Sequence, residues 1–210
     1  MRYRRKKDWI IPYVKGKKVL DLGCVQHSID ETKKAEWLHG IIRKHAASVI
    51  GVDYLASEVV SLKEQGYDVI CANVETMELR DKFEAIVAGD IIEHLANCGK
   101  FMERAKDHLA PGGLLLITTP NPMNILRLVQ LIAKGRIVEN AEHTCWFTSH
   151  GMSELARRYG LKIADTAYVD DSHLYYKPTF LFAPFLLLNY ILCLIRPQVS
   201  ETICFVLRGE

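Results

Sequence analysis

Short, continuously apolar runs recur along the first 120 residues of the chain, and amphipathic stretches separate them. Strands that are apolar at every position, rather than at every second one, are typical of parallel sheets covered on both faces. Helices between such strands form βαβ units with right-handed crossovers. We therefore predict an α/β fold with a doubly wound, Rossmann-like sheet. Its first strands are expected at residues 19–22, 48–53, 68–73, 85–90 and 114–119.

Apolar residues at helical spacing mark the segments between these strands. The alternation of strands and helices then stops. Two later runs both have the pattern of strands and are expected to form a C-terminal antiparallel pair. These late strands are expected at 162–169 and 202–207. The sheet is thus predicted to be mostly parallel. Helices are expected at residues 33–47, 56–65, 92–109 and 150–159, the third of them stopped by Pro111-Gly112-Gly113.

An apolar segment interrupts the late strand pair. Residues 180–195 form a sixteen-residue run without a charge, and it contains Pro184 and Asn189. A bilayer span needs about 20 apolar residues, so a spanning helix is not favoured. A buried helix, a dimer interface and a membrane-surface anchor each fit the run. We expect a single domain over residues 1–210, with a helical apolar insertion at about 175–198.

Charge and cysteine content restrict the partners and the compartment. The net charge of +2 is too small to favour nucleic acid. The basic run at residues 2–7 is expected to be a solvated, frayed end, with contact to an anionic membrane or a charged substrate as the alternative. The six cysteines form no CxxC pair and no zinc-ligand spacing with histidine, so no metal is expected. A cytoplasmic location is expected, with membrane association left open.

Small or acidic residues follow four successive predicted strands. They are Asp21, Gly23 and Cys24 after the first, Asp53 after the second, Asn73 after the third, and Gly89 with Asp90 after the fourth. The carboxyl ends of parallel strands meet at one edge of a sheet, where such folds bind ligands. A buried carboxylate needs a partner, so packing alone does not explain this set. We therefore predict a ligand site at this edge.

The turn after the first strand distinguishes two nucleotide-type ligands. A dinucleotide requires GxGxxG, which lets backbone amides approach a pyrophosphate. This turn has Gly23 alone, and Val25 lacks the conformational freedom of a second glycine. A ligand without phosphates, such as the cationic S-adenosylmethionine, makes a weaker demand on the turn. In either ligand, ribose hydroxyls could donate hydrogen bonds to Asp53.

Four segments resemble the motifs of the class I methyltransferases, and within them the group related to ubiquinone-biosynthesis methyltransferases. The resemblance covers about residues 15–170. It implies the seven-stranded methyltransferase fold and S-adenosylmethionine as cofactor. The segments are residues 19–24, 51–53, 83–95 with its Glu-His-Leu, and 109–121 with its Pro-Gly-Gly and Thr-Pro-Asn.

The same resemblance implies roles for the residues at the strand ends. Asp21 and Gly23, with Cys24, would line the methionine part of the cofactor, and Asp53 would hold the ribose hydroxyls. Asn73 and Val74 would flank the adenine, and Gly89 and Asp90 would complete the wall. The chain departs from the family pattern at Val25 and His27, which replace glycines, and in an apparent insertion over residues 29–37.

Three histidines are candidate general bases for a hydroxyl acceptor. His94 closely follows the fourth strand, and its alternative is a structural role at the start of a helix. His143 lies in a loop where the resembled family has a Glu-His pair facing the substrate, and its alternative is a structural hydrogen bond. His27 is the least favoured of the three. General-base catalysis contributes about 10²–10⁴-fold to a rate.

Together these features predict a methyltransferase that acts on a small-molecule, glycan or lipid-linked acceptor, at oxygen. The apolar helix expected at 121–134 and the run at 180–195 suggest the lipid-linked class, with a helical cap or a homodimer contact as the alternative. A catalytically inactive, methyltransferase-like binding or membrane-associated scaffold is the second hypothesis. A nicotinamide-dependent oxidoreductase is the third, and the missing glycines argue against it.

Overall fold

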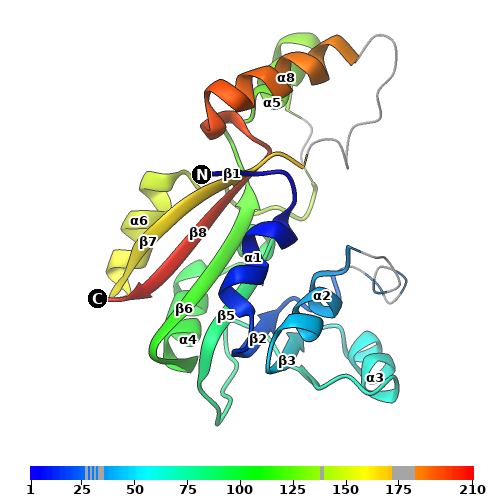
Figure 1. The fold of residues 1–210 in the computed structure, drawn as a ribbon, viewed down its shortest axis with the longest axis vertical. Coiled ribbons are helices and arrows are strands. Elements are labelled where there is room, and N and C mark those ends of the chain that lie inside the picture. The colour runs from blue at the N-terminus through cyan, green and yellow to red at the C-terminus, as the bar shows by residue number, and fades with distance from the viewer. Residues whose placement is uncertain (27, 29, 31, 33–35, 138–139, 172–182) are drawn as a thin grey trace.

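One mixed sheet carries the described part of the chain, which a computed structural model gives as residues 1–26, 28, 30, 32, 36–137, 140–171 and 183–210 (Figure 1). The strand order is β1-β7-β8-β6-β5-β2-β3-β4, and β8 is antiparallel to both of its neighbours while all other pairs are parallel. The strands are β1 (Arg2–Tyr3), β2 (Lys18–Leu22), β3 (Ser48–Asp53), β4 (Val69–Cys71), β5 (Phe83–Gly89), β6 (Leu109–Pro120), β7 (Leu161–Val169) and β8 (Thr202–Gly209).

Helices cover both faces of this sheet. On one face, α1 and α2 pack Trp9, Ile10 and Ile42 against alternate residues of β2, β5 and β6. On the other face, α4 and α6 pack against the intervening residues of the same strands. The helices are α1 (Lys6–Val14), α2 (Leu38–His45), α3 (Ala56–Glu64), α4 (Cys98–His108), α5 (Ile125–Lys134), α6 (Ser149–Arg158) and α8 (Ala183–Ile195), with 3-10 turns η2 (Ile92–His94) and η3 (Pro197–Val199).

The predicted fold class is confirmed, because the sheet is doubly wound and mostly parallel, and the last strand of the chain, β8, is antiparallel to its neighbours. Seven of its strands have the expected arrangement, and β1 adds an eighth at the edge. The segment at 92–109 is not one helix, since η2 and α4 are separate and β6 already begins at Leu109. Part of the expected helix at 33–47 lies outside the described residues.

The N-terminal basic run is not frayed, which corrects the sequence-based expectation. Backbone pairing places Arg2 and Tyr3 beside β7, and Arg2 forms an ion pair with Asp170 at 2.7 Å. Lys6 begins α1 and forms ion pairs with Asp90 and Asp171. Burial of Trp9 and Ile10 explains why this end is ordered, because α1 then has an apolar side to cover the sheet.

The apolar run forms α8, which lies beside α5 at one end of the molecule (Figure 1). Residues 172–182 of the expected insertion lie outside the described part. Among the described helices, none is long and apolar enough to cross a membrane.

Removing a core side chain is expected to destabilise this sheet. Ile86 on β5 is fully buried between β2 and β6, so Ile86→Ala should lower the free energy of unfolding by about 2–5 kcal/mol. The matched control is Ile132→Ala on α5, whose side chain is 78% exposed and should lose much less. Urea unfolding followed by circular dichroism measures both, and equal losses would contradict this core assignment.

Candidate functional site

A cavity of about 740 Å³ opens at the carboxyl ends of β2, β3, β4 and β5. Strand β2 has β3 on one side and β5 on the other, so the direction in which successive strands are added reverses beside β2. Open α/β sheets bind ligands at such a switch point, and the cavity lies there. Its size is that of a small-molecule site. Six of the eight predicted cofactor residues line it, namely Gly23, Asp53, Asn73, Val74, Gly89 and Asp90.

Asp53 organises the floor of this cavity. One carboxylate oxygen accepts a hydrogen bond from the Val25 amide at 3.0 Å, and the other accepts from the Leu55 amide at 3.2 Å. The carboxylate therefore joins the end of β3 to the turn after β2. Each oxygen keeps accepting capacity toward the cavity, because an ionised carboxylate has about four lone-pair sites.

In the turn after β2, a residue other than glycine adopts the left-handed backbone conformation. Gly23 and Gln26 adopt left-handed φ values of +77° and +66°, so the strained position falls on Gln26 and not on Val25. Val25 instead buries its side chain beside Trp37 and donates its amide to Asp53. The turn thus keeps a defined backbone without the glycines of the family pattern. The other substituted position, His27, lies outside the described residues.

Two predicted cofactor residues, Asp21 and Cys24, do not line the cavity. Asp21 is buried and contacts Nδ1 of His39 at 2.9 Å, and burial raises the pKa of this carboxyl. The Cys24 carbonyl accepts from the Trp37 indole at 2.7 Å. Both residues therefore contact the helix and loop that follow the turn, and they lie outside the cavity lining. Their direct contact with a cofactor stays a prediction.

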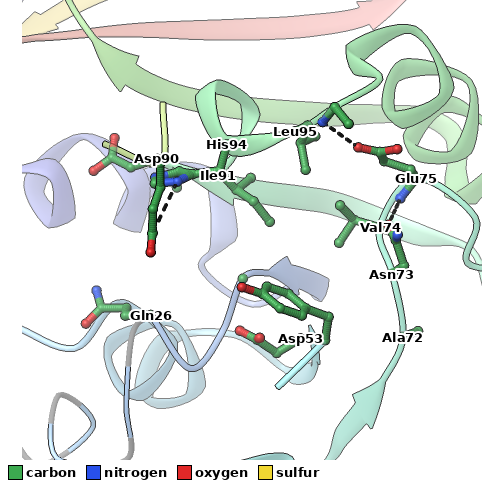
Figure 2. Close-up of a pocket in the computed structure, with 15 residues that line it drawn as sticks. Gln26, Asp53, Ala72, Asn73, Val74, Glu75, Asp90, Ile91, His94 and Leu95 are labelled. Atoms are coloured by element: carbon green, nitrogen blue, oxygen red, sulfur yellow. Dashed lines mark hydrogen bonds and ion pairs between the residues drawn. The ribbon is translucent and has the colours of Figure 1, made fainter. Parts of the chain in front are cut away.

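The two glycines at the strand ends let the walls approach closely. A Cβ added at Gly23 would lie 3.1 Å from the Ile91 side chain, and one at Gly89 would lie 2.7 Å from Leu38. Figure 2 shows Asp53 and Gln26 on one side of the cavity, and Asp90, Ile91 and His94 on the other.

The cavity wall is acidic. Asp53, Glu75, Asp90 and Glu142 line it, and no Lys or Arg does so among the described lining residues. Burial opposes the charge of Asp90, but the Lys6 ammonium and the Thr118 hydroxyl hold its pKa below the usual value. A wall lined by carboxyl groups favours a cationic ligand and disfavours one that carries phosphates.

A second, polar cavity of about 340 Å³ adjoins the first, because Asp90 and His94 line both. The two candidate bases meet here. The His143 ring packs edge-on against the His94 ring, with 4.7 Å between centroids. The loop of His143 is held by Thr144, whose amide and hydroxyl donate to the Glu93 carbonyl at 2.7 and 3.0 Å.

Glu93 lies buried beside these histidines. Its Oε2 accepts from the Thr119 hydroxyl at 3.0 Å, while Oε1 has no hydrogen-bond partner among the described residues. Burial, with the Asp90 charge, raises the pKa of Glu93 to about 8. One ligand atom from each of Glu93, His94 and His143 lies within 4.8 Å of the others, so this set could share a divalent cation.

Sequence reasoning missed several residues that build the site. Gln26, Tyr54 and Glu75 line the first cavity, and Lys6 and Glu201 line the second. Tyr54 and Glu75 directly follow Asp53 and Val74, so the strand-end pattern could have found them. Lys6 and Glu201 come from distant parts of the chain, and only the topology brings them together.

A switch-point cavity with an acidic wall, on a mostly parallel sheet whose last strand in the chain is antiparallel, defines the Rossmann-like methyltransferase class. Two solved structures of S-adenosylmethionine-dependent methyltransferases share this fold. The structure from Archaeoglobus fulgidus has a TM-score of 0.61 and 15% identity, covering 97% of this chain and 92% of that one. The structure from Mesorhizobium loti has a TM-score of 0.59 and 16% identity, covering 96% and 95%.

The chain belongs to the methyltransferase domain family, whose profile matches residues 2–166. Curated relatives are ubiquinone biosynthesis O-methyltransferases. The one from Nitrobacter winogradskyi is 33% identical over 112 residues, which is 50% of this chain and 40% of that protein. The mitochondrial one from Rattus norvegicus is 27% identical over 143 residues, which is 61% and 39%. The match thus spans about two fifths of the relatives' length.

The raised pKa of Glu93 predicts a pH dependence of stability. Between the usual carboxyl pKa near 4.5 and the folded-state value of about 8, the folded chain holds a proton that the unfolded chain has released. The free energy of unfolding should therefore fall as the pH rises through this interval. Glu93→Gln removes the titration, so its stability relative to wild type should increase with pH.

Urea unfolding across this interval, in buffer with a chelator, measures the difference. Glu64→Gln, an exposed change on α3, is the matched control and should follow wild type. A Glu93→Gln curve parallel to wild type at every pH would contradict the assignment.

Proposed function

We propose that the protein is an S-adenosylmethionine-dependent methyltransferase that methylates an oxygen of a hydroxyl-bearing small molecule, glycan or lipid-linked acceptor. The observation that carries this proposal is the acidic switch-point cavity, which adjoins a polar cavity where two histidines meet. The first cavity suits the cofactor and the second suits the acceptor.

The residues of the first cavity fit this cofactor. Its sulfonium and ammonium groups are cations, which the carboxylates of Asp53, Asp90 and Glu142 favour. Asp53 retains lone pairs for ribose hydroxyls after holding Val25 and Leu55. Asn73 and Val74 offer a mixed polar and apolar surface for adenine. When bound, the cofactor supplies an electrophilic methyl group.

The chain's own residues contribute alignment and proton removal. Positioning donor and acceptor in adjoining cavities supplies much of the rate of a displacement reaction. A hydroxyl acceptor must also lose its proton, and we assign this step to His143, with His94 beside it. The relatives are named O-methyltransferases, which supports oxygen as the methylated atom. No feature of the described residues favours the inactive scaffold.

Cofactor binding is the first test of the proposal. Calorimetric titration with S-adenosylmethionine and S-adenosylhomocysteine is expected to give micromolar-range affinity, which is about −8 kcal/mol. Asp53→Ala should abolish binding, because it removes a ligand group and releases the Val25 turn. Asp68→Ala, an exposed change directly before β4 and outside the cavity lining, is the control and should bind as wild type. A folded wild-type protein that binds neither ligand would refute the proposal.

The role of His143 is tested separately. His143→Ala should reduce methyl transfer by about 10²–10⁴-fold while cofactor affinity stays unchanged, because the residue lines the second cavity only. His150→Ala, at an exposed position of α6, provides the matched control. Transfer is measured as S-adenosylhomocysteine release with candidate hydroxyl acceptors. Unchanged turnover in His143→Ala would exclude its role as the base.

A further inference from the structure

Helices α5 and α8 are inverted relative to ordinary surface helices. The buried side of α8 carries the polar Asn189 together with Cys193, and the buried side of α5 carries Arg127 next to Leu126. Most of their large apolar side chains point outward instead. A surface helix normally buries its apolar stripe and exposes its polar one. This pair therefore calls for something apolar on the outside.

The outward residues form a defined surface, which we call the apolar face. Each is between 40% and 78% exposed, although all are large and apolar. Single exposed apolar residues are normal, but a contiguous group marks an interaction site. The apolar face consists of Leu128, Leu131 and Ile132 on α5, with Leu187, Leu188, Tyr190, Ile191, Leu194 and Ile195 on α8.

Buried polar contacts hold this face outward. Arg127 on α5 donates to the Glu201 carboxylate and to the Asn121 carbonyl, each at 3.2 Å. Asn189 on α8 donates to the Asp170 carboxylate at 3.3 Å. Turning either helix to bury its apolar residues would leave Glu201 or Asp170 without these bonds, at a high desolvation cost.

Basic residues surround the apolar face. Neither helix contains Asp or Glu. Arg2 and Arg4 lie over the Tyr190 ring, with 5.1 and 6.0 Å to its centroid. Arg196 follows α8 at the end where α5 begins, because Asn124 at the start of α5 donates to Val199 of η3.

The opposite end of α5 is also basic, since Lys134 closes the helix and the exposed Arg136 follows it. Apolar residues rimmed by Lys and Arg, with a tyrosine at the boundary, are typical of helices that lie in the interface of an anionic bilayer. A second copy of the chain fits less well, because it would bring equally basic helix ends against these without an acid to pair them.

We propose that the apolar face docks onto the surface of an anionic lipid bilayer, with α5 and α8 lying in the membrane plane. The thirteen residues of α8 extend about 20 Å, less than the hydrocarbon thickness of about 30 Å, so the helix inserts along the surface and not across it. Leucine and isoleucine side chains enter the acyl boundary. The exposed basic residues contact lipid phosphates, namely Arg4, Lys134, Arg136 and Arg196.

Docking also orients the second cavity. Glu201 lines that cavity and is bonded to Arg127 on α5, so the cavity lies directly behind the docked helices. In so far as the proposed function holds, an acceptor anchored in the bilayer would reach the histidines with its hydroxyl-bearing head.

Cosedimentation with vesicles tests the docking. The full chain is expected to bind vesicles of phosphatidylglycerol and phosphatidylcholine, and to bind phosphatidylcholine alone at least about tenfold more weakly. The variant Leu187→Glu/Leu194→Glu places carboxylates two turns apart on the apolar face and should weaken binding by at least about tenfold. Val60→Glu/Gln65→Glu adds the same charge on α3 and at its C-cap, away from this face, and should bind as wild type.

Several outcomes would overturn the proposal. One is that the wild-type protein stays in the supernatant with both vesicle types. Another is that the Leu187→Glu/Leu194→Glu variant, the face variant, binds vesicles as tightly as wild type. A dimer in light scattering that the face variant dissociates, without vesicle binding, would assign the face to a second copy. Titration of the same samples with S-adenosylhomocysteine separates the two proposals, because retained cofactor binding without vesicle binding refutes docking alone.

Discussion

A parallel sheet covered on both faces leaves its strands no place for charge except at their ends. Strands β2, β5 and β6 are buried on alternate sides by two helical layers, so their buried polar residues lie near the carboxyl edge. At the same edge, the Asp53 carboxylate joins the end of β3 to the turn after β2, because it accepts from the Leu55 and Val25 amides. The acidic cavity follows from this constraint, because the carboxylates that β3 and β5 deliver there face a space and not a core.

The sequence predicted this edge well because it depends on local pattern. Continuous apolar runs located the strands, and the residues that follow them, such as Asp53, Asn73 and Asp90, line the cavity. Asp21 shows where the pattern fails. It is at a strand end like the others, but His39, which is 1% exposed and comes from the following helix, takes its carboxylate away from the cavity. A side chain's direction at a strand end depends on partners that spacing does not reveal.

Long-range partners account for the rest of what was missed. Lys6 contacts Asp90, which lies 84 residues later in the chain, and Glu201 lines the same region from the position just before β8. The run at 180–195 shows a related limit. Its composition predicted a helix, but a nearly uniform apolar sequence has no stripe that tells which side faces the protein. Asn189 decides the orientation, since its bond to Asp170 turns the remaining apolar residues outward.

The position of Lys6 makes the amino-terminal end less suitable than the carboxyl-terminal end for attaching an affinity tag. Its ammonium contacts the Asp90 carboxylate on the cavity wall, and the Met1 carbonyl accepts from the Tyr168 amide at the sheet edge. An affinity tag at the amino terminus would therefore sit within a few residues of the cavity and compete with this edge pairing. Strand β8 runs antiparallel to β6, so Gly209 ends at the opposite edge of the sheet, far from the cavity (Figure 1). We therefore expect a tag after Glu210 to lie away from the site.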